Sequence, residues 1–140
     1  MSFLNKEIKI SFLITNSNHI VIKCKVNSID SRLLVDTGAS NSCINYLSAN
    51  KFKMNFKTSN ENASSATNKI KETFYSNNNI LEIEDLKKNN FEVILFDMTH
   101  INNSLTEKGI STVDGIIGSD ILKELNAIID YKKKTISLKL

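Results

Sequence analysis

The first third of the chain alternates apolar and polar residues with the two-residue period of β-strands. Apolar side chains occupy every second position in residues 6–15 and again in residues 19–26, and polar reversals follow at 16–18 and 27–30. Such alternation buries one face of a strand and exposes the other. The pattern therefore predicts two half-buried strands, and the apolar run at 32–35 predicts a short buried one.

Five more alternating or apolar runs predict strands along the rest of the chain. They cover residues 69–75, 80–86, 91–98, 127–131 and 135–139. The polar residues 87–90 are expected to turn between the second and third of these strands. Lysines 132–134 are expected to form the solvated turn of a closing hairpin.

Helix signals are fewer than strand signals. Residues 45–52, with Asn45 as cap, fit one or two helical turns, and residues 99–109 are expected to form a loop with a short helix. A short helix is predicted over 119–125, with Ser119 as its N-cap and an acidic residue in its first turn. The sequence therefore predicts an all-β fold with one short C-terminal helix.

Composition limits what the chain can be. Its 140 residues fit a single domain, residues 1–140, and leave no room for a second lobe. A hydrophobic content of 41% suffices for a core, and a net charge of +3 with no basic face interleaved with aromatics argues against a nucleic-acid partner. No apolar run reaches the length of a membrane helix, and residues 1–20 lack the features of a signal peptide. We therefore expect a cytoplasmic protein that binds no membrane.

The two cysteines are too few for a disulfide framework. Cys24 and Cys43 are expected to be structural thiols in a reducing compartment. No spacing among the cysteines and the two histidines matches a metal site. The sequence therefore predicts neither a metal nor another cofactor.

The stretch 35–40, Val-Asp-Thr-Gly-Ala-Ser, carries the clearest chemical signal and occurs once. An apolar strand ends at Val35 and delivers the Asp36 carboxylate into a tight turn. Thr37 supplies a hydroxyl for the backbone, and Gly38 lets the chain reverse without a Cβ clash. Two such carboxylates that share one proton can activate water. Because the chain has a single copy, the motif predicts a homodimer with its site on the two-fold axis.

A second motif lies near the C-terminal end, where Gly115-Ile116-Ile117-Gly118 precedes the predicted helix. Together with the apolar strand and Asp-Thr-Gly-Ala-Ser about 80 residues earlier, this pattern resembles the retropepsin-like aspartic proteases, single-lobe dimeric relatives of pepsin. Residues 126–138 also resemble the closing hairpin of cellular members. The resemblance implies an all-β, retropepsin-like acid-protease half-barrel and an endopeptidase that hydrolyses peptide bonds.

The resemblance also implies roles residue by residue. Asp36 takes the place of the catalytic aspartate, and Thr37 that of the threonine that grips its counterpart across the two-fold axis. Gly38 lets backbone approach the carboxylates, and Ala39-Ser40 completes the loop. The segment Ile116-Ile117-Gly118 is expected to support that loop from beside it.

Two features depart from the family's pattern. Some members carry an arginine after the glycine of the second motif, whereas this chain has Ser119, so an ion pair from that position is not expected. Members also carry glycines at the tip of the flap, a mobile hairpin over the substrate, but no glycine lies between Gly38 and Gly109. Asparagine tolerates left-handed backbone and can replace glycine in a turn. The implied flap and substrate-binding residues are Asn62, Ala63, Ser64 and Ser65.

In the implied mechanism, two Asp36 carboxylates about 3 Å apart hold one proton between them. The ionised one takes a proton from water, which attacks the scissile carbonyl, and the protonated one hydrogen-bonds the carbonyl oxygen and then supplies a proton toward the leaving nitrogen. Four apolar residues are expected in the core first and in the substrate cleft second: Ile44, Phe74, Phe96 and Ile117.

Other interpretations stay open at this point. Asp-Thr-Gly also occurs in ordinary strand-end turns. The same fold can serve as a peptide-binding or dimerisation module without useful turnover, which the glycine-free flap favours. A third interpretation is an asymmetric partner that contributes one aspartate to a heterodimer.

A serine or cysteine nucleophile is the weakest alternative. Ser40, Ser42 and Cys43 would each need a base within reach. Only His19 and His100 are available, and neither stands in the context of a catalytic triad. Both are expected to be ordinary surface histidines.

Overall fold

The structure, a computed structural model, describes residues 6–58 and 73–140. Within those residues the strands are β1 (Glu7–Ser11), β2 (Leu13–Ile14), β3 (Ile20–Val26), β4 (Ile29–Val35), β5 (Cys43–Asn45), β6 (Lys57–Thr58), β7 (Phe74–Ile83), β8 (Leu86–Phe96), β9 (Gly115–Ile117), β10 (Ile128–Asp130) and β11 (Thr135–Lys139). The helical segments are the 3₁₀ turn η2 (Tyr46–Ser48) and the helices α1 (Thr99–Glu107) and α2 (Ser119–Glu124). The expected all-β fold and its C-terminal helix, α2, are confirmed. The short helix expected within the loop at residues 99–109 is α1.

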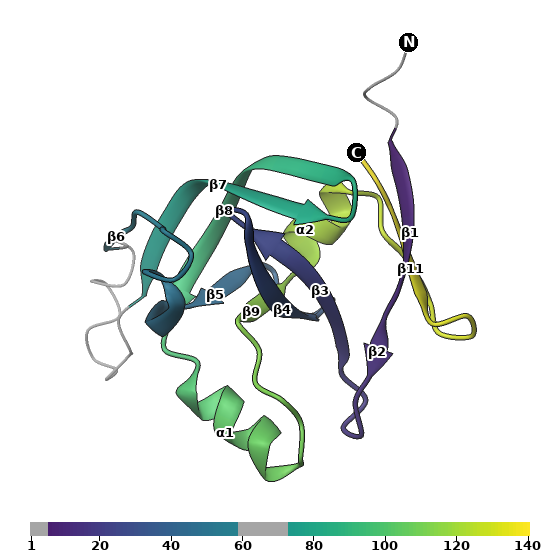
Figure 1. The fold of residues 1–140 in the computed structure, drawn as a ribbon, viewed down its shortest axis with the longest axis horizontal. Helices are drawn as coiled ribbons and strands as arrows, with labels where there is room; N and C mark the ends of the chain where they lie inside the picture. The colour runs from purple at the N-terminus through teal and green to yellow at the C-terminus, as the bar shows by residue number, and fades with distance from the viewer. Residues whose placement is uncertain (1–5, 59–72) are drawn as a thin grey trace.

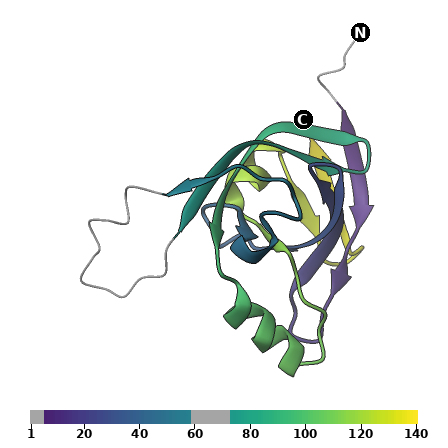
Figure 2. The same cartoon turned by 60° about the vertical axis from the view of Figure 1, so that its left-hand side comes forward.

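Six of the described strands close into a barrel. The large sheet has the order β2-β3-β4-β9-β5-β8-β7-β6, and β3 also pairs with β7. The ring therefore runs through β3, β4, β9, β5, β8 and β7, and Figure 2 shows strands curving around a common interior. Large apolar side chains without exposed surface fill its interior, among them Leu33, Ile44, Phe52, Leu81 and Phe91.

A second apolar cluster lies where α1 meets the barrel. We call it the α1 cluster, and its buried members are Val21, Leu34, Met98, Leu105, Ile110, Val113 and Ile116. Val21 and Leu34 pair across β3 and β4, so the α1 cluster covers the face of those strands opposite the barrel core.

The termini meet in a separate three-stranded sheet of order β1-β11-β10. Its register runs from Glu7 opposite Lys139 to Ser11 opposite Thr135. Figure 1 shows this sheet at one side of the molecule, with β6 at the opposite side. The predicted closing hairpin is therefore confirmed, and the terminal strands lie side by side.

The expected turn at residues 87–90 is wrong. These residues belong to β8, and the chain reverses at Glu84 and Asp85, where Glu84 has φ 52°. Lys88 is buried although it is charged, because its ammonium group pairs with Glu124 at 3.0 Å. A lysine stem can lie along apolar surface while its charged end reaches a partner, so the polar run does not mark a turn.

Of the two helix caps predicted from the sequence, one is confirmed and one is wrong. The Oδ1 of Asn45 accepts a hydrogen bond from the amide of Leu47 at 3.2 Å, so the predicted cap of η2 is confirmed although the helical segment is shorter than expected. The N-cap of α2 is Gly118, not Ser119. The hydroxyl of Ser119 instead donates to the carbonyl oxygen of Ala39 at 3.1 Å, because the loop at residues 36–40 lies against the start of this helix.

Strand β9 lies between β4 and β5. It is parallel to β4, with Leu34 opposite Ile116, and antiparallel to β5, with Ile44 opposite Gly115. A Cβ atom on Gly115 would lie 2.2 Å from the carbonyl oxygen of Cys43. The narrow passage of β9 therefore requires a residue without a side chain at this position.

Replacing Gly115 by alanine should lower the free energy of unfolding by about 2–3 kcal/mol, because the new methyl group meets backbone that cannot move aside. Urea denaturation of the purified variant measures this loss. The matched control is Gly109→Ala, where no atom lies within 4 Å of the added Cβ. Only the positive φ of 75° then opposes the substitution, at a cost of about 1 kcal/mol. Equal losses in the two variants would contradict the steric argument.

Candidate active site

The loop that follows β4 brings Asp36 to the end of β9. The amide of Asp36 donates to the carbonyl oxygen of Ile117 at 2.9 Å, which extends the parallel pairing of β4 and β9 by one residue. After Asp36 the chain turns, and the amide of Ala39 donates to the Asp36 carbonyl at 3.1 Å. The first motif therefore starts its turn at the point where the second motif ends its strand.

The Asp36 carboxylate is exposed at the surface and is held by its own turn. Its Oδ1 accepts a hydrogen bond from the amide of Gly38 at 2.9 Å. A Cβ atom on Gly38 would lie 3.3 Å from the same oxygen, which is a tight contact. Thr37 is exposed as well. The loop thus presents a carboxylate of fixed orientation to the outside of this chain.

Ser42 joins the two motifs from inside the protein. Its hydroxyl donates to Oδ1 of Asp120 at 2.8 Å and accepts from the amide of Gly118 at 2.9 Å. Its own amide donates to Oδ2 of Asp120 at 3.0 Å. Ser42 and Gly118 are both buried, so water does not compete for the bond between them, whereas Asp120 keeps part of its surface exposed. The sequence singled out Ser42 only as a nucleophile, and its burial beneath the loop makes it a structural link instead.

The segment after Gly118 closes the loop from the other side. The amide of Ser119 donates to the carbonyl oxygen of Ala39 at 2.7 Å, in addition to the bond from its hydroxyl. A Cβ atom on Gly118 would lie only 2.5 Å from that carbonyl oxygen. Ser119 therefore connects to the loop at residues 36–40 by hydrogen bonds, in the position where some family members have an arginine.

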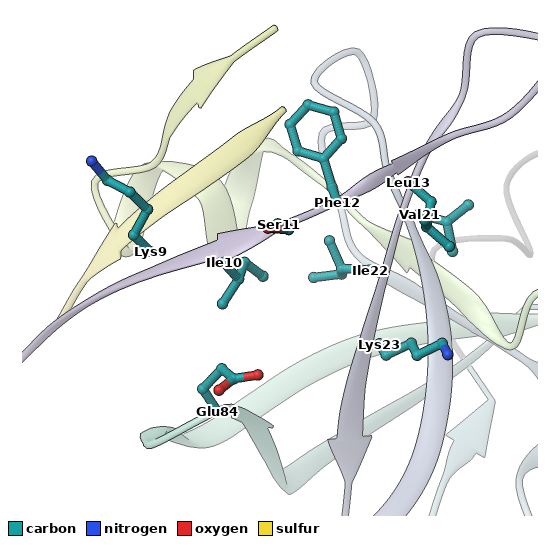
Figure 3. Close-up of a pocket in the computed structure, with 9 residues that line it drawn as sticks. All are labelled: Lys9, Ile10, Ser11, Phe12, Leu13, Val21, Ile22, Lys23 and Glu84. Carbon is teal, nitrogen blue, oxygen red and sulfur yellow. The ribbon is translucent and has the colours of Figure 1, made fainter. Parts of the chain in front are cut away.

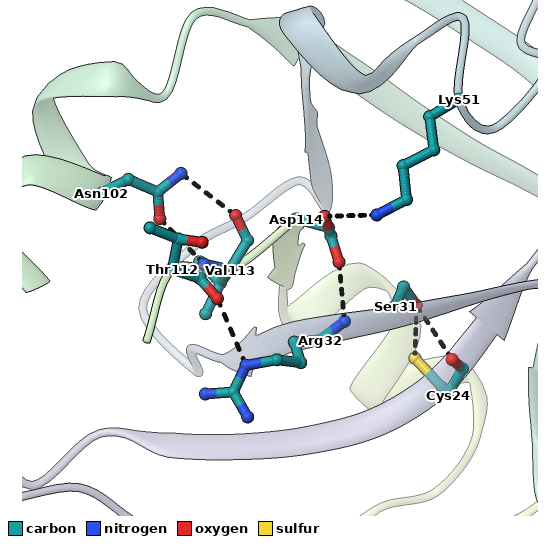
Figure 4. A network of polar contacts seen from close by, with 8 residues as sticks. All are labelled: Cys24, Ser31, Arg32, Lys51, Asn102, Thr112, Val113 and Asp114. Carbon is teal, nitrogen blue, oxygen red and sulfur yellow. Dashed lines mark hydrogen bonds and ion pairs between the residues drawn. The ribbon is translucent and has the colours of Figure 1, made fainter. Parts of the chain in front are cut away.

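A polar network fixes the other end of β9. The amide of Arg32 donates to Oδ2 of Asp114 at 2.9 Å, and the amide of Asp114 donates back to the Arg32 carbonyl at 2.8 Å. Lys51 forms an ion pair with Oδ1 of Asp114 at 3.3 Å, as Figure 4 shows. The Nε of Arg32 also donates to the carbonyl of Thr112 at 3.2 Å. The start of β9 is thereby tied to the middle of β4.

Asp36 and Thr37 line an open pocket of 410 Å³. Its other walls combine the apolar residues Leu34, Ile101 and Ile116 with the polar residues Asn18, His19 and Tyr131. His19 is exposed, as the sequence suggested, but its place beside Asp36 carries no signal in the sequence. Ile44 and Ile117 have 0% and 2% exposure and lie in the core, so they do not line this pocket.

A second pocket, of 480 Å³, lies away from Asp36 between β1, β3 and the turn after β7. Figure 3 shows its apolar residues Ile10, Phe12 and Ile22, with Glu84 reaching toward it from the turn. Its lining includes no residue of either motif, so we take the Asp36 pocket as the candidate site.

The flap residues Asn62, Ala63, Ser64 and Ser65 lie outside the described residues. The strands that flank them are described: β6 and β7 pair with Lys57 opposite Tyr75 and Thr58 opposite Phe74. Phe74 stacks on Tyr46 with ring centroids 4.6 Å apart, and Phe56 meets both rings edge-on. We call Tyr46, Phe56 and Phe74 the aromatic cluster, and it connects the paired strands β6 and β7 to η2.

Neither thiol has the properties of a nucleophile. Burial raises the pKa of the Cys43 thiol to about 11, and the nearby carboxylates of Asp120 and Asp36 contribute to the rise. Burial likewise raises the pKa of Cys24 to about 11, although its bond with Ser31 works in the opposite direction. Neither cysteine forms a disulfide, and because their pKa values are about 11, both are neutral thiols at physiological pH.

Two further observations bear on possible sites in the described residues. Among residues 6–58 and 73–140, no group of three or more histidine, cysteine, aspartate or glutamate side chains is arranged to hold a metal ion. Within the same ranges, no helix is both long and apolar enough to span a bilayer.

The sequence matches a known protein family over most of its length. The model of a family described as aspartyl protease matches residues 22–121, which include both motifs. None of the curated proteins matches the chain in sequence.

Solved structures of aspartic proteases have the same fold. A retropepsin-like aspartic protease from Rickettsia conorii is similar with a TM-score of 0.63 and 18% identity, over 96% of this chain and 91% of that chain. The retroviral protease-like domain of Ddi1 from Leishmania major is similar with a TM-score of 0.62 and 18% identity, over 86% of this chain and 87% of that one. EIAV protease in complex with the inhibitor HBY-793 is similar with a TM-score of 0.56 and 17% identity, over 84% of this chain and 98% of that one. The fold is therefore retropepsin-like.

Replacing Ser42 by alanine should lower the free energy of unfolding by about 2 kcal/mol, because the buried amide of Gly118 and the carboxylate of Asp120 each lose a partner. Urea denaturation measures the loss. Ser40→Ala, an exposed serine in the same loop, is the matched control and should change stability by less than about 0.5 kcal/mol. A Ser42→Ala protein as stable as the control would show that the link is dispensable.

Both thiols should react slowly with Ellman's reagent at pH 8. A pKa of about 11 in place of 9.0 leaves a thiolate fraction about a hundredfold lower than that of the unfolded chain in urea. Because the thiolate is the reactive form, raising the pH toward 11 should accelerate the reaction of the native protein with the reagent. Stopped-flow absorbance measures the rates, and Cys43→Ser isolates Cys24. Fast labelling of the native protein at pH 8 would contradict the raised pKa values.

Proposed function

The chain belongs to the aspartyl protease family, and we propose that it is an endopeptidase whose active site forms between two copies of the chain. Hydrolysis would use water activated by two Asp36 carboxylates, one from each copy. The observation that carries this proposal is the exposed Asp36 carboxylate, held in a fixed orientation by Gly38 at the edge of a pocket.

The need for two chains follows from the chemistry. One carboxylate can accept a proton from water but cannot also donate one to the leaving group in the same step. A pair of carboxylates that share one proton does both. Because Asp36 lies at the surface with Thr37 and Gly38, a symmetric partner can place its own Asp36 opposite without rearranging the barrel. The two Thr37 residues would then form reciprocal hydrogen bonds across the two-fold axis, beside the carboxylates.

The reaction proceeds in two proton transfers. The ionised carboxylate takes a proton from the water as its oxygen attacks the scissile carbonyl carbon. The protonated carboxylate hydrogen-bonds the carbonyl oxygen and then supplies a proton toward the leaving nitrogen. In our proposal, Ala39, Ser40 and the segment Ile116-Ile117-Gly118 keep the loop in position throughout, because the bonds of Ser42 and Ser119 leave it little freedom.

The substrate in this proposal is a peptide in extended conformation. An extended chain offers backbone groups to both sides and places alternate side chains in pockets on either face. Residues 62–65 would cover it from the hairpin that begins at the pairing of β6 with β7. Partners are therefore a second copy of the chain and a peptide or protein substrate.

The alternative is a module that dimerises or binds peptides without useful turnover. It draws support from the lack of any glycine between Gly38 and Gly109, because glycine is the residue that most readily allows a mobile hairpin tip. The preserved Asp-Thr-Gly-Ala-Ser stretch and its hydrogen bonds favour the enzyme.

Replacing Asp36 by alanine should abolish cleavage of an unbiased peptide mixture between about pH 4 and 7, because the proton-sharing pair is lost. Mass spectrometry of the products measures cleavage, and a statine-type transition-state mimic should inhibit the wild type. Asp85→Asn is the matched control, since Asp85 lies in the exposed turn after β7 and should leave cleavage unchanged. Cleavage that survives Asp36→Ala would refute the mechanism.

Mixtures of the wild type with Asp36→Asn test the stoichiometry of the same site. If each site needs two intact copies, co-refolding equal amounts should reduce activity to about a quarter of that of the same total amount of wild type, because mixed dimers are inactive. Independent chains would retain half. Sedimentation at micromolar concentration should show dimers for both proteins, and strictly monomeric proteins would contradict the proposal.

A further inference from the structure

Helix α1 is fixed beside the Asp36 pocket. The side-chain amide of Asn102 forms two bonds with Val113, donating to its carbonyl at 3.1 Å and accepting from its amide at 2.8 Å. At the start of the helix, the Oδ1 of Asp97 accepts from the amide of Thr99 at 2.8 Å. Asn45 also accepts a bond from the amide of Met98 at 3.1 Å, so β5 holds the chain where α1 begins. The helix therefore has little freedom to move relative to β9.

One side chain of α1 reaches the pocket. Ile101 and Leu105 are one helical turn apart and share a face. Leu105 is only 3% exposed within the α1 cluster, and Ile101 packs against the edge of the same cluster. Ile101 keeps part of its surface open and lines the pocket with Asp36 and Ile116. It is the described residue of α1 that borders the pocket.

We propose that Ile101 is a specificity-determining residue that limits the size of the substrate side chain next to the scissile bond. This inference rests on the proposed function. The scissile carbonyl has to lie at Asp36, so the neighbouring side chain enters the space that Asp36 shares with Ile101 and Ile116. A β-branched isoleucine has few rotamers, and a fixed helix cannot withdraw it. The pocket therefore favours branched aliphatic side chains such as leucine or valine over aromatic ones.

The test compares wild type, Ile101→Ala and Ile101→Phe with two kinds of probe. The first is a pair of peptides that differ only in leucine or phenylalanine before the cleaved bond, scored by kcat/KM. The second is a pair of statine-type inhibitors with an isobutyl or a benzyl side chain, scored by Kd. Ile101→Ala should shift both ratios toward the aromatic probe by about tenfold or more, and Ile101→Phe should shift them the other way.

The control separates pocket size from general damage. Leu47→Ala removes an aliphatic side chain that is 64% exposed and does not line the pocket, so it should leave both ratios unchanged. Thermal unfolding and sedimentation verify that each variant remains folded and assembled.

Each outcome decides between the proposals. Cleavage with the same size preference in all variants overturns the role of Ile101 and leaves the protease standing. Inhibitor binding that follows Ile101, without any cleavage by wild type, supports the role of Ile101 in a binding module and overturns the protease. If wild type neither binds the inhibitors nor cleaves the peptides, both proposals fail.

Discussion

The passage of β9 between β4 and β5 is the constraint on which the site depends. Gly115 lets the strand enter next to the Cys43 carbonyl, and Gly118 lets it leave next to the Ala39 carbonyl. A side chain at either position would push β9 away from the loop. The bonds from Asp36 to Ile117 and from Ser119 to Ala39 form only at this separation. The geometry of the carboxylate is therefore determined by residues about 80 positions further along the chain.

Hydrogen bonds of buried polar groups also restrict the loop at residues 36–40 to one placement against β9. Ser42 accepts from the buried amide of Gly118 and donates to both carboxylate oxygens of Asp120, a partly exposed residue whose Oδ1 also accepts from the amide of Ile121. Leaving such groups unpaired costs more than their pairing contributes, so alternative placements of the loop are strongly disfavoured. A similar logic applies to Asp114, which accepts from Arg32 and Lys51 at the other end of β9. Both ends of one three-residue strand are thereby fixed by acidic side chains.

The features that depend on local pattern could be predicted from the sequence. Alternation identified β3, the closing hairpin followed from two apolar runs around three lysines, and the two motifs together indicated the retropepsin-like fold. Features that depend on a partner far away in the sequence were not predicted. The charge of Lys88, a buried strand residue, is paired with Glu124. Ser42 is a buried link through its bond to Asp120, a residue 78 positions further along the chain. No local pattern reports such partners, and the same holds for His19 and Ile101 at the pocket.

The placement of the tyrosines has an optical consequence. The chain contains three tyrosines and no tryptophan. Tyr46 belongs to the aromatic cluster, Tyr75 pairs with Lys57 where β7 meets β6, and Tyr131 lines the pocket of Asp36. Tyrosine fluorescence therefore originates at two places, the pocket of Asp36 and the pairing of β6 with β7. A label-free optical signal is built into these two regions of the molecule.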